Sequence, residues 1–344
     1  MSLSRREMLK RSGAVGAAAA TLGLPTSAFA GPSTATKSYP IRSQDTNNLV
    51  IFVTHDDNPF FIPVRFGLEE FGEMAGWETQ WVGPPQHDEQ ATLQFQLDAI
   101  AAQPVAIGFT RVNTTMFDEP ILQAQEAGIY AILYNTASEG YQELGVAYVG
   151  QDFIPAGIIS GQNAAKHAQE ITGRSEGEII LGTIAPGHSA LDARMEGARQ
   201  GIAAYNEENG TTFTTSDLTT STDGPAAIAA LDAVYAEKGD AIVGFAHADF
   251  VHWHAGTWIE QTGLEGRFAN GGFDLVPGVM DAIQVGTAQW SIAQNPYAQG
   301  WITASLIHMA TAHDYPAFDY DTGAEVVDST NIEAVVEREA VFAE

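Results

Sequence analysis

LVIFVTHDDNPFF, residues 49–61, is an unbroken apolar run followed by polar residues, a proline and two phenylalanines. Residues 49–54 are bounded on both sides by polar residues, which predicts a short strand buried on both faces of its sheet. Beyond the polar turn, Phe60, Val64 and Leu68 recur at helical spacing. The stretch therefore predicts a buried strand, a polar turn and an amphipathic helix packed against the sheet.

The same alternation of strand and helix repeats along the chain. Further apolar runs predict strands at 79–82, 105–110, 129–134, 178–184, 213–218, 241–246, 268–273 and 288–293, and the polar tail contains a strand-like segment at 324–327. Amphipathic periods predict helices at 88–102, 116–127, 154–171, 191–206, 225–236, 250–262, 277–283 and 297–312. Near-continuous apolar strands that alternate with helices indicate parallel sheets covered on both faces. Because the alternation restarts after Gly150, we expect an α/β fold with two doubly wound parallel-sheet lobes.

The first 30 residues have the layout of an export signal. Arg5 and Arg6 precede an apolar run at 14–24 that is rich in Ala and Gly, and small residues end the segment. A basic start, a short apolar middle and a small-residue cleavage site are typical of a signal peptide, and adjacent arginines indicate the twin-arginine (Tat) route. We therefore expect a signal peptide at 1–30, a linker at 31–46 and a mature protein in the periplasm or outside the cell.

The composition excludes several classes of protein. The chain has 344 residues, of which 45% are hydrophobic, and it has no cysteine. A disulfide scaffold, a cysteine nucleophile and a lipoprotein anchor are thereby excluded. The formal net charge is -28, and such a surface repels nucleic acid and anionic membranes. We interpret the acidity as an adaptation of a soluble protein to salty surroundings rather than as a surface for a basic partner.

Polar side chains follow the predicted strands at the ends where open parallel sheets bind ligands. With the aromatic residues beside them, the candidate ligand-binding residues are Asn58, Phe60, Phe61, Asn135, Arg194, His247, Asp249, Asp274 and Gln294. A sugar needs this mixture, because each hydroxyl both donates and accepts hydrogen bonds and aromatic rings pack on its apolar C–H faces. A single Asp or Asn at such a turn is as typical of a helix N-cap, so the prediction depends on the whole set.

Four short motifs occur in order along the chain: NPFF at 58–61, VGQD at 149–152, GFD at 272–274 and AQNPYAQG at 293–300. In these motifs the chain resembles the periplasmic sugar-binding proteins of ABC importers, in the ribose and simple-sugar group with the periplasmic-binding-protein type I fold. The resemblance extends over nearly all of the predicted mature chain.

The resemblance implies two lobes joined by a three-strand hinge, with the ligand between them. The first lobe would comprise residues 47–150 and 295–325, and the second 151–294 and 326–344. The implied function is that of an extracytoplasmic solute-binding protein, which captures a small neutral sugar or polyol by hinge closure and delivers it to an ABC permease. Such a protein is a monomer and not an enzyme, and it needs no cofactor or metal.

The resemblance also implies individual roles. Asn58, Phe60 and Phe61 would contact the ligand from the first lobe, Arg194 and Asp274 would do so from the second, and Gln294 would supply an amide near the hinge. The sequence departs from the ribose-binding pattern at Asn135 and Thr136, where the family has Asp and Arg, and at Ala248, where the family has an Asn before the Asp that Asp249 matches. A related pentose, hexose, polyol or small furanone-like ligand fits these changes better than ribose.

Two alternatives stay open from the sequence. One is a ligand-sensing module for a receptor, which has the same fold in the family. The other is a secreted carbohydrate-active or metal-dependent enzyme, suggested by His252, Trp253 and His254. Residues two apart diverge on a strand or a helix, so these histidines make a poor chelate, and we expect a solvent-facing pair beside a packed Trp253. Trp253 could instead reach the cleft and stack on a ligand.

Overall fold

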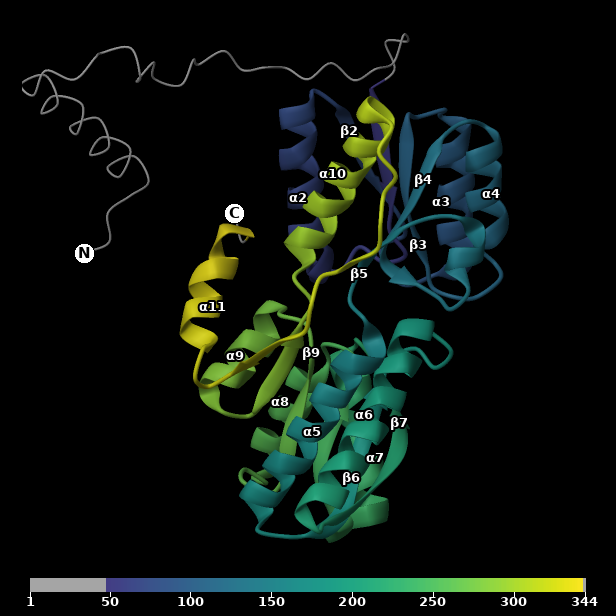
Figure 1. Cartoon of the computed structure of the whole chain (residues 1–344). Helices are drawn as coiled ribbons and strands as arrows, with labels where there is room; N and C mark the ends of the chain where they lie inside the picture. The colour runs from purple at the N-terminus through teal and green to yellow at the C-terminus, as the bar shows by residue number, and fades with distance from the viewer. Residues whose placement is uncertain (1–47, 343–344) are drawn as a thin grey trace, which may run out of the picture. The chain divides into compact units, whose positions relative to one another are not determined.

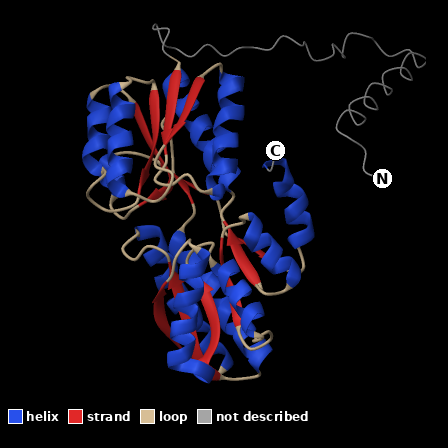
Figure 2. Ribbon diagram, turned by 180° about the vertical axis from the view of Figure 1, so that it is seen from behind, coloured by secondary structure: helices blue, strands red, loops and turns tan. Residues whose placement is uncertain are grey.

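The computed structural model describes residues 48–342, so the predicted export signal (1–30) and linker (31–46) lie outside the described residues. This part of the chain forms two α/β lobes, each with a six-stranded sheet. Helices cover both faces of each sheet (Figure 1, Figure 2). The expected fold class is thus confirmed in its two doubly wound lobes.

The first sheet has the strand order β11-β5-β4-β3-β1-β2, with every neighbouring pair parallel. Its strands are β1 (Leu49–Val53), β2 (Glu78–Val82), β3 (Ala106–Arg111), β4 (Tyr130–Ala137), β5 (Tyr148–Gly150) and β11 (Tyr320–Asp321). Its helices are α2 (Ile62–Ala75), α3 (Glu89–Ala101), α4 (Asp118–Glu126) and α10 (Pro296–His313), with short 3-10 turns at Pro59–Phe61 and Tyr141–Leu144. Buried apolar residues of β1 and β3 form the centre of this lobe, as their unbroken apolar runs predict.

The second sheet repeats this order as β12-β10-β9-β8-β6-β7. Its strands are β6 (Glu176–Thr183), β7 (Thr212–Thr219), β8 (Ile242–His247), β9 (Ala269–Phe273), β10 (Trp290–Ala293) and β12 (Glu325–Asp328). Its helices are α5 (Phe153–Thr172), α6 (Ser189–Asn209), α7 (Gly224–Lys238), α8 (His252–Thr262), α9 (Pro277–Val285) and α11 (Ile332–Glu339), with 3-10 turns at Gly239–Ala241 and Ala340–Phe342. In both lobes the order reverses next to the first strand, which is the point where doubly wound sheets bind ligands.

The chain passes between the lobes three times, between β5 and α5, between β10 and α10, and between β11 and β12. These crossings place the late helix α10 in the first lobe, beside α2, and return the chain to the second lobe (Figure 1). The Gln151 side chain donates a hydrogen bond to the Gly323 carbonyl at 3.0 Å, which ties the first crossing to the third. A three-strand connection is therefore present, as the resemblance implied.

The structure differs from the sequence-based elements at the end of the chain. β12 pairs with β10 in the antiparallel direction, so the second sheet is mixed rather than wholly parallel. The reason is topological: the third crossing enters this sheet directly from the first lobe, without the helical crossover that a parallel neighbour requires. The short strands β5 and β11 and the helix α11 were not predicted, because runs of so few residues carry little periodic signal.

The glycines of α5 and α6 let these two helices pack unusually closely. Gly157, Gly161, Gly197 and Gly201 face the partner helix, and a β-carbon at any of them would collide with its backbone. The small residues of α5 therefore lie at its contact with α6 in the second lobe. In the described part of the chain, no helix combines the length and the apolarity that crossing a membrane requires.

Candidate functional site

A cavity of ≈ 640 Å³ lies where the carboxyl ends of the two sheets meet. Residues at the end of β4 and residues that follow β1 and β2 line it from the first lobe, and residues that follow β6, β7, β8, β9 and β10 line it from the second. Its volume falls within the usual range for small-molecule sites, about 300–1,000 Å³. The cavity contains all but one of the predicted site residues, namely Asn58, Phe60, Phe61, Asn135, Arg194, Asp249, Asp274 and Gln294.

The turn after β1 holds its aromatic residues in place through Asn58. The Asn58 side chain accepts a hydrogen bond from the Phe60 N–H at 2.9 Å and caps the 3-10 turn that precedes α2. Phe60 and Phe61 are buried, and their rings meet edge to face with centroids 5.0 Å apart. Asn58 is therefore an N-cap as well as a residue of the cavity wall, and its contact with a ligand stays a prediction.

A chain of buried amides links the two lobes. Asn135, at the end of β4, donates to the Gln299 Oε1 atom at 3.0 Å, and Gln299 donates to the Gln294 Oε1 atom at 3.0 Å. Gln294 in turn donates to the Asp274 carboxylate at 2.6 Å. Asn135 and Asp274 both have a positive φ, 60° and 70°, which few residues other than glycine adopt. Tertiary contacts thus hold the polar side chains at both strand ends in specific orientations.

Arg194 is the cation of the site. It is 3% exposed, and it projects from α6 between the rings of Phe273 and Phe153, whose centroids lie 4.1 and 5.3 Å from the guanidinium carbon. Its two terminal nitrogens donate to the Ala248 carbonyl and the Gln151 side chain, each at 3.0 Å, whereas its Nε–H has no partner among the described residues. The guanidinium is therefore fixed in direction, and its Nε–H is left without a partner in the described part of the chain.

Two buried carboxyl groups lie near Arg194. Asp249 accepts hydrogen bonds from the N–H groups of Ile184 at 2.9 Å and Val251 at 3.1 Å, yet burial raises its pKa to about 7. Burial also raises the pKa of Asp274, which Arg194 and Gln294 oppose. The cavity wall thus holds one cation and two carboxyl groups, and burial disfavours the charged form of each carboxyl group.

The structure does not bring His247 into this group. His247 is 2% exposed, its ring packs against Gly182 of β6, and it is not among the cavity-lining residues. As the last residue of β8, it points into the lobe because successive strand residues alternate between the faces of a sheet. Asp249, two positions further on, belongs to the turn that reaches the cavity.

The expectation of a solvent-facing histidine pair at 252 and 254 was wrong. His252 and His254 are 0% and 5% exposed, and they contact the backbone carbonyls of Asp249 at 3.3 Å and Thr222 at 3.2 Å. Trp253, the residue between them, lines the cavity. Helix α8 therefore presents the indole to the cavity and buries its histidines, the arrangement that places an aromatic surface where a ligand could stack.

Several cavity residues were not among the predicted set. His55, His87 and His188 line the cavity, as do Asp56, Phe153, Trp253 and the turn at 220–222. His55 and His188 follow strands β1 and β6, so the rule on strand ends could have included them. His87 and Phe153 follow no predicted strand directly, and sequence periodicity gives no signal for them.

The two sheets have the same strand order, and the cavity lies between the carboxyl ends of their strands. These features define the class of the periplasmic-binding-protein fold. The family model described as "Periplasmic binding protein domain" matches residues 49–313, which are most of the chain. The chain therefore belongs to the family of periplasmic binding proteins.

Known relatives are similar over most of their length. A xylose/arabinose-binding protein of Sulfolobus acidocaldarius is 24% identical over 301 residues, which are 83% of this chain and 72% of that protein. A glucose-galactose binding protein of Geobacillus stearothermophilus has a TM-score of 0.73 at 18% identity and covers 83% of this chain and 99% of its own. A carbohydrate transporter protein of Acidothermus cellulolyticus, solved with myo-inositol, has a TM-score of 0.73 at 20% identity, with 87% and 100% covered.

Proposed function

We propose that the protein is an extracytoplasmic solute-binding protein that captures a small neutral sugar or polyol, of the pentose or hexose class, for an ABC importer. The observation that carries the proposal is the cavity between the lobes, where a buried Arg194, two buried carboxyl groups and several amides converge among aromatic rings. The names of the relatives, which bind xylose, arabinose, glucose, galactose or myo-inositol, support the same ligand class.

The charge balance of the cavity favours an uncharged ligand. Arg194 is opposed by Asp274 and Asp249, whose charged forms burial disfavours, so the cavity offers no strong net charge to a carboxylate or an ammonium group on the ligand. A hydroxyl, in contrast, can accept from an N–H of Arg194, which lines the cavity, and donate to a carboxylate. Phe60, Phe61 and Trp253 supply the apolar surfaces for the C–H faces of a sugar ring.

The mechanism follows from the position of the cavity. A ligand that contacts both lobes stabilises the arrangement in which the lobes approach, because it binds that arrangement more tightly than a separated one. The three crossings supply the hinge for this motion. A permease in the cytoplasmic membrane would then recognise the closed protein and receive the solute, and no bond is made or broken.

We propose further that the chain is exported by the Tat route and acts as a monomer in the periplasm or outside the cell. The paired Arg5 and Arg6 and the apolar run behind them support export. The lobe boundaries 47–150 with 295–325, and 151–294 with 326–344, stay a prediction that limited proteolysis of the purified protein would test.

A thermal-shift screen of the mature protein, without a tag and with EDTA present, tests the proposed function. The ligands are pentoses, hexoses, polyols and furanones. A ligand that binds only the folded state, at a concentration 100 times its Kd, stabilises the folded protein by about 2.7 kcal/mol. We expect one ligand class to raise the Tm, and small-angle scattering to show a more compact protein with that ligand. A screen in which charged solutes alone raise the Tm would contradict the proposal.

Variants locate the binding site. Arg194→Ala and Asp274→Ala each remove a polar group of the cavity, and each should abolish the ligand-dependent shift. Arg199→Ala is the matched control, because Arg199 lies on the same helix α6 but is paired with Asp217 at the surface. Circular dichroism checks that each variant folds. Binding that persists in both cavity variants would show that the solute binds elsewhere.

A further inference from the structure

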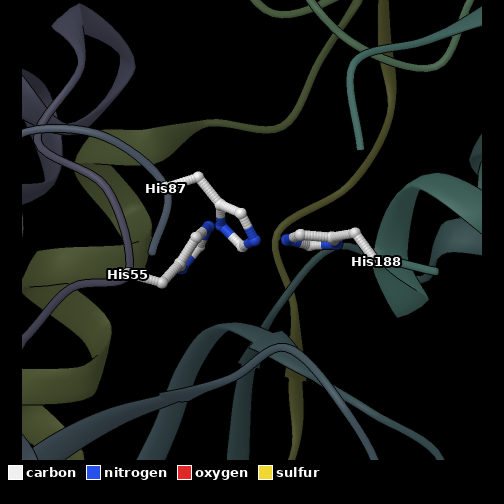
Figure 3. A group of neighbouring side chains, drawn as sticks. All are labelled: His55, His87 and His188. Carbon is white, nitrogen blue, oxygen red and sulfur yellow. The ribbon is translucent and has the colours of Figure 1, made fainter. Parts of the chain in front are cut away.

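Three histidines of the cavity wall come together from separate parts of the chain. His55 follows β1, His87 lies between β2 and α3, and His188 is the N-cap residue of α6. Each offers one ring nitrogen, and these nitrogens all lie within 4.8 Å of one another. Figure 3 shows the three rings gathered together, with nitrogens of His87 and His188 facing each other. The cluster brings together residues distant in the sequence and from both lobes.

The two buried histidines of the cluster each have a ring nitrogen that makes no hydrogen bond. The Nδ1 atoms of His55 and His188 are buried and have no hydrogen-bond partner among the described residues. An unsatisfied buried polar group costs about 1–3 kcal/mol, so the fold keeps these atoms unpaired at a cost. The ring centroids are 5.4 Å apart for His55 and His188, and likewise for His87 and His188, and no hydrogen bond joins these rings.

The lobes already touch beside the cluster. The Ser189 N–H donates to the Val112 carbonyl at 3.2 Å, and the hydroxyl groups of Ser138 and Ser189 are 2.7 Å apart. Ser189 is the first residue of α6, next to His188. These contacts hold the start of α6 against the first lobe, and so they keep His188 within reach of His55 and His87.

Some charges near the cluster disfavour the binding of a cation, and others favour it. The N-terminus of α6 and the buried Arg194 disfavour a cation. Asp56, which lines the same cavity and interacts electrostatically with His87, favours one, as does the overall net charge of -28. Coordination by imidazole nitrogens, rather than charge attraction, must therefore supply most of the affinity.

We propose that His55, His87 and His188 form a site for a divalent transition-metal ion of the zinc class, which links the two lobes. Imidazole suits zinc, copper and nickel, and three protein ligands leave a fourth position open, here toward the cavity. Nitrogens on a tetrahedral zinc lie about 3.3 Å apart. Metal binding therefore requires the rings to come closer than they are here, and His87, the least buried of the three, has the most room to turn.

Calorimetric titration of ZnCl₂ into untagged, EDTA-treated and dialysed protein tests the site. We expect one ion per chain, and a loss of affinity of at least about tenfold, or about 1.4 kcal/mol, in His87→Gln and in His188→Gln. His167→Gln is the matched control, because His167 stacks on Trp290 in the second lobe and takes no part in the cluster. No heat at micromolar zinc, or unchanged binding in both cluster variants, would overturn the proposal.

A second measurement tests the link between lobes. Because the chain has no cysteine, a Glu126→Cys, Glu237→Cys pair places one spin label on α4 of the first lobe and one on α7 of the second. Zinc should narrow the distance distribution between the labels, and His188→Gln should abolish that narrowing. Zinc binding without narrowing would refute the bridging role. The titration uses no sugar and the sugar screen contains EDTA, so each proposal can fail without the other.

Discussion

Arg194 shows how a residue that belongs on a protein surface is stabilised inside the cavity wall. Its guanidinium lies between two phenylalanine rings, donates two hydrogen bonds and faces the carboxyl groups of Asp249 and Asp274. Breaking such a buried group of charges by removing one partner typically costs about 3–5 kcal/mol. The site is therefore specific in geometry and sensitive to substitution at the same residues.

Asp249 makes the stability of the protein depend on pH. Its pKa is about 7 in the folded protein because burial disfavours the charged form, against an ordinary value of 3.8. Between these two values the folded state holds a proton that the unfolded state has released, so its contribution to stability is complete at low pH and is lost as the pH rises toward 7.

We expect Asp249→Asn to flatten this part of the profile, measured as the free energy of unfolding in urea between about pH 4 and pH 8. Asp217→Asn, at an exposed position of the same lobe, should leave the profile unchanged. An Asp249→Asn profile that still falls as steeply as that of the wild type would assign the pH dependence to other groups.

At the scale of elements, the contact between α5 and α6 holds the second lobe together. Gly161 lies against the backbone of Ala198, with no room for a β-carbon. Because α6 carries both Arg194 and His188, the spacing of these helices also sets the position of two cavity residues.

We expect Gly161→Val to separate the helices and to lower the free energy of unfolding by about 1–3 kcal/mol. Urea denaturation measures this change. Gln162→Ala, at the exposed neighbouring position of α5, should change stability by less than about 0.5 kcal/mol. A stable Gly161→Val protein with unchanged sugar binding would show that the close helix contact is not needed.

At the scale of the whole molecule, the net charge of -28 is the dominant property. Several cations of the described chain are already paired with carboxylates, among them Arg65, Arg199, Lys238, Arg267 and Arg338. The remaining acidic groups repel one another, and this repulsion opposes the compact state.

We expect the Tm to rise as NaCl is increased from about 0.01 M to 1 M, because the screening length falls from about 30 Å to 3 Å. Each kcal/mol that screening adds to the free energy of unfolding should raise the Tm by roughly 2–4 °C. Scanning calorimetry in chloride salts measures the effect, since sulfate would also strengthen apolar burial. A Tm that falls with added NaCl would contradict the interpretation of the acidic surface.

Local patterning predicted most of the elements that form the two sheets. The strand at Leu49–Val53 and the helix after it follow from an apolar run and a 3.6-residue period, which neighbouring residues alone determine. The strand-end rule likewise predicted Asn58, Arg194 and Asp274, because parallel strands all direct their carboxyl ends to one edge. The short β11 and the antiparallel direction of β12 could not be predicted in this way, because they depend on pairing with a neighbouring strand rather than on the local sequence.

By itself, the sequence determined the two α/β lobes, the order of their elements and the chemical character of the strand-end turns. Only the tertiary structure decided which of these side chains share a cavity: it excluded His247, buried His252 and His254, turned Trp253 inward and gathered His55, His87 and His188. The physical reason is the separation along the chain of the residues that determine each feature. Periodicity and turn chemistry depend on residues a few positions apart, whereas the cavity depends on contacts between lobes that are joined by three crossings of the chain.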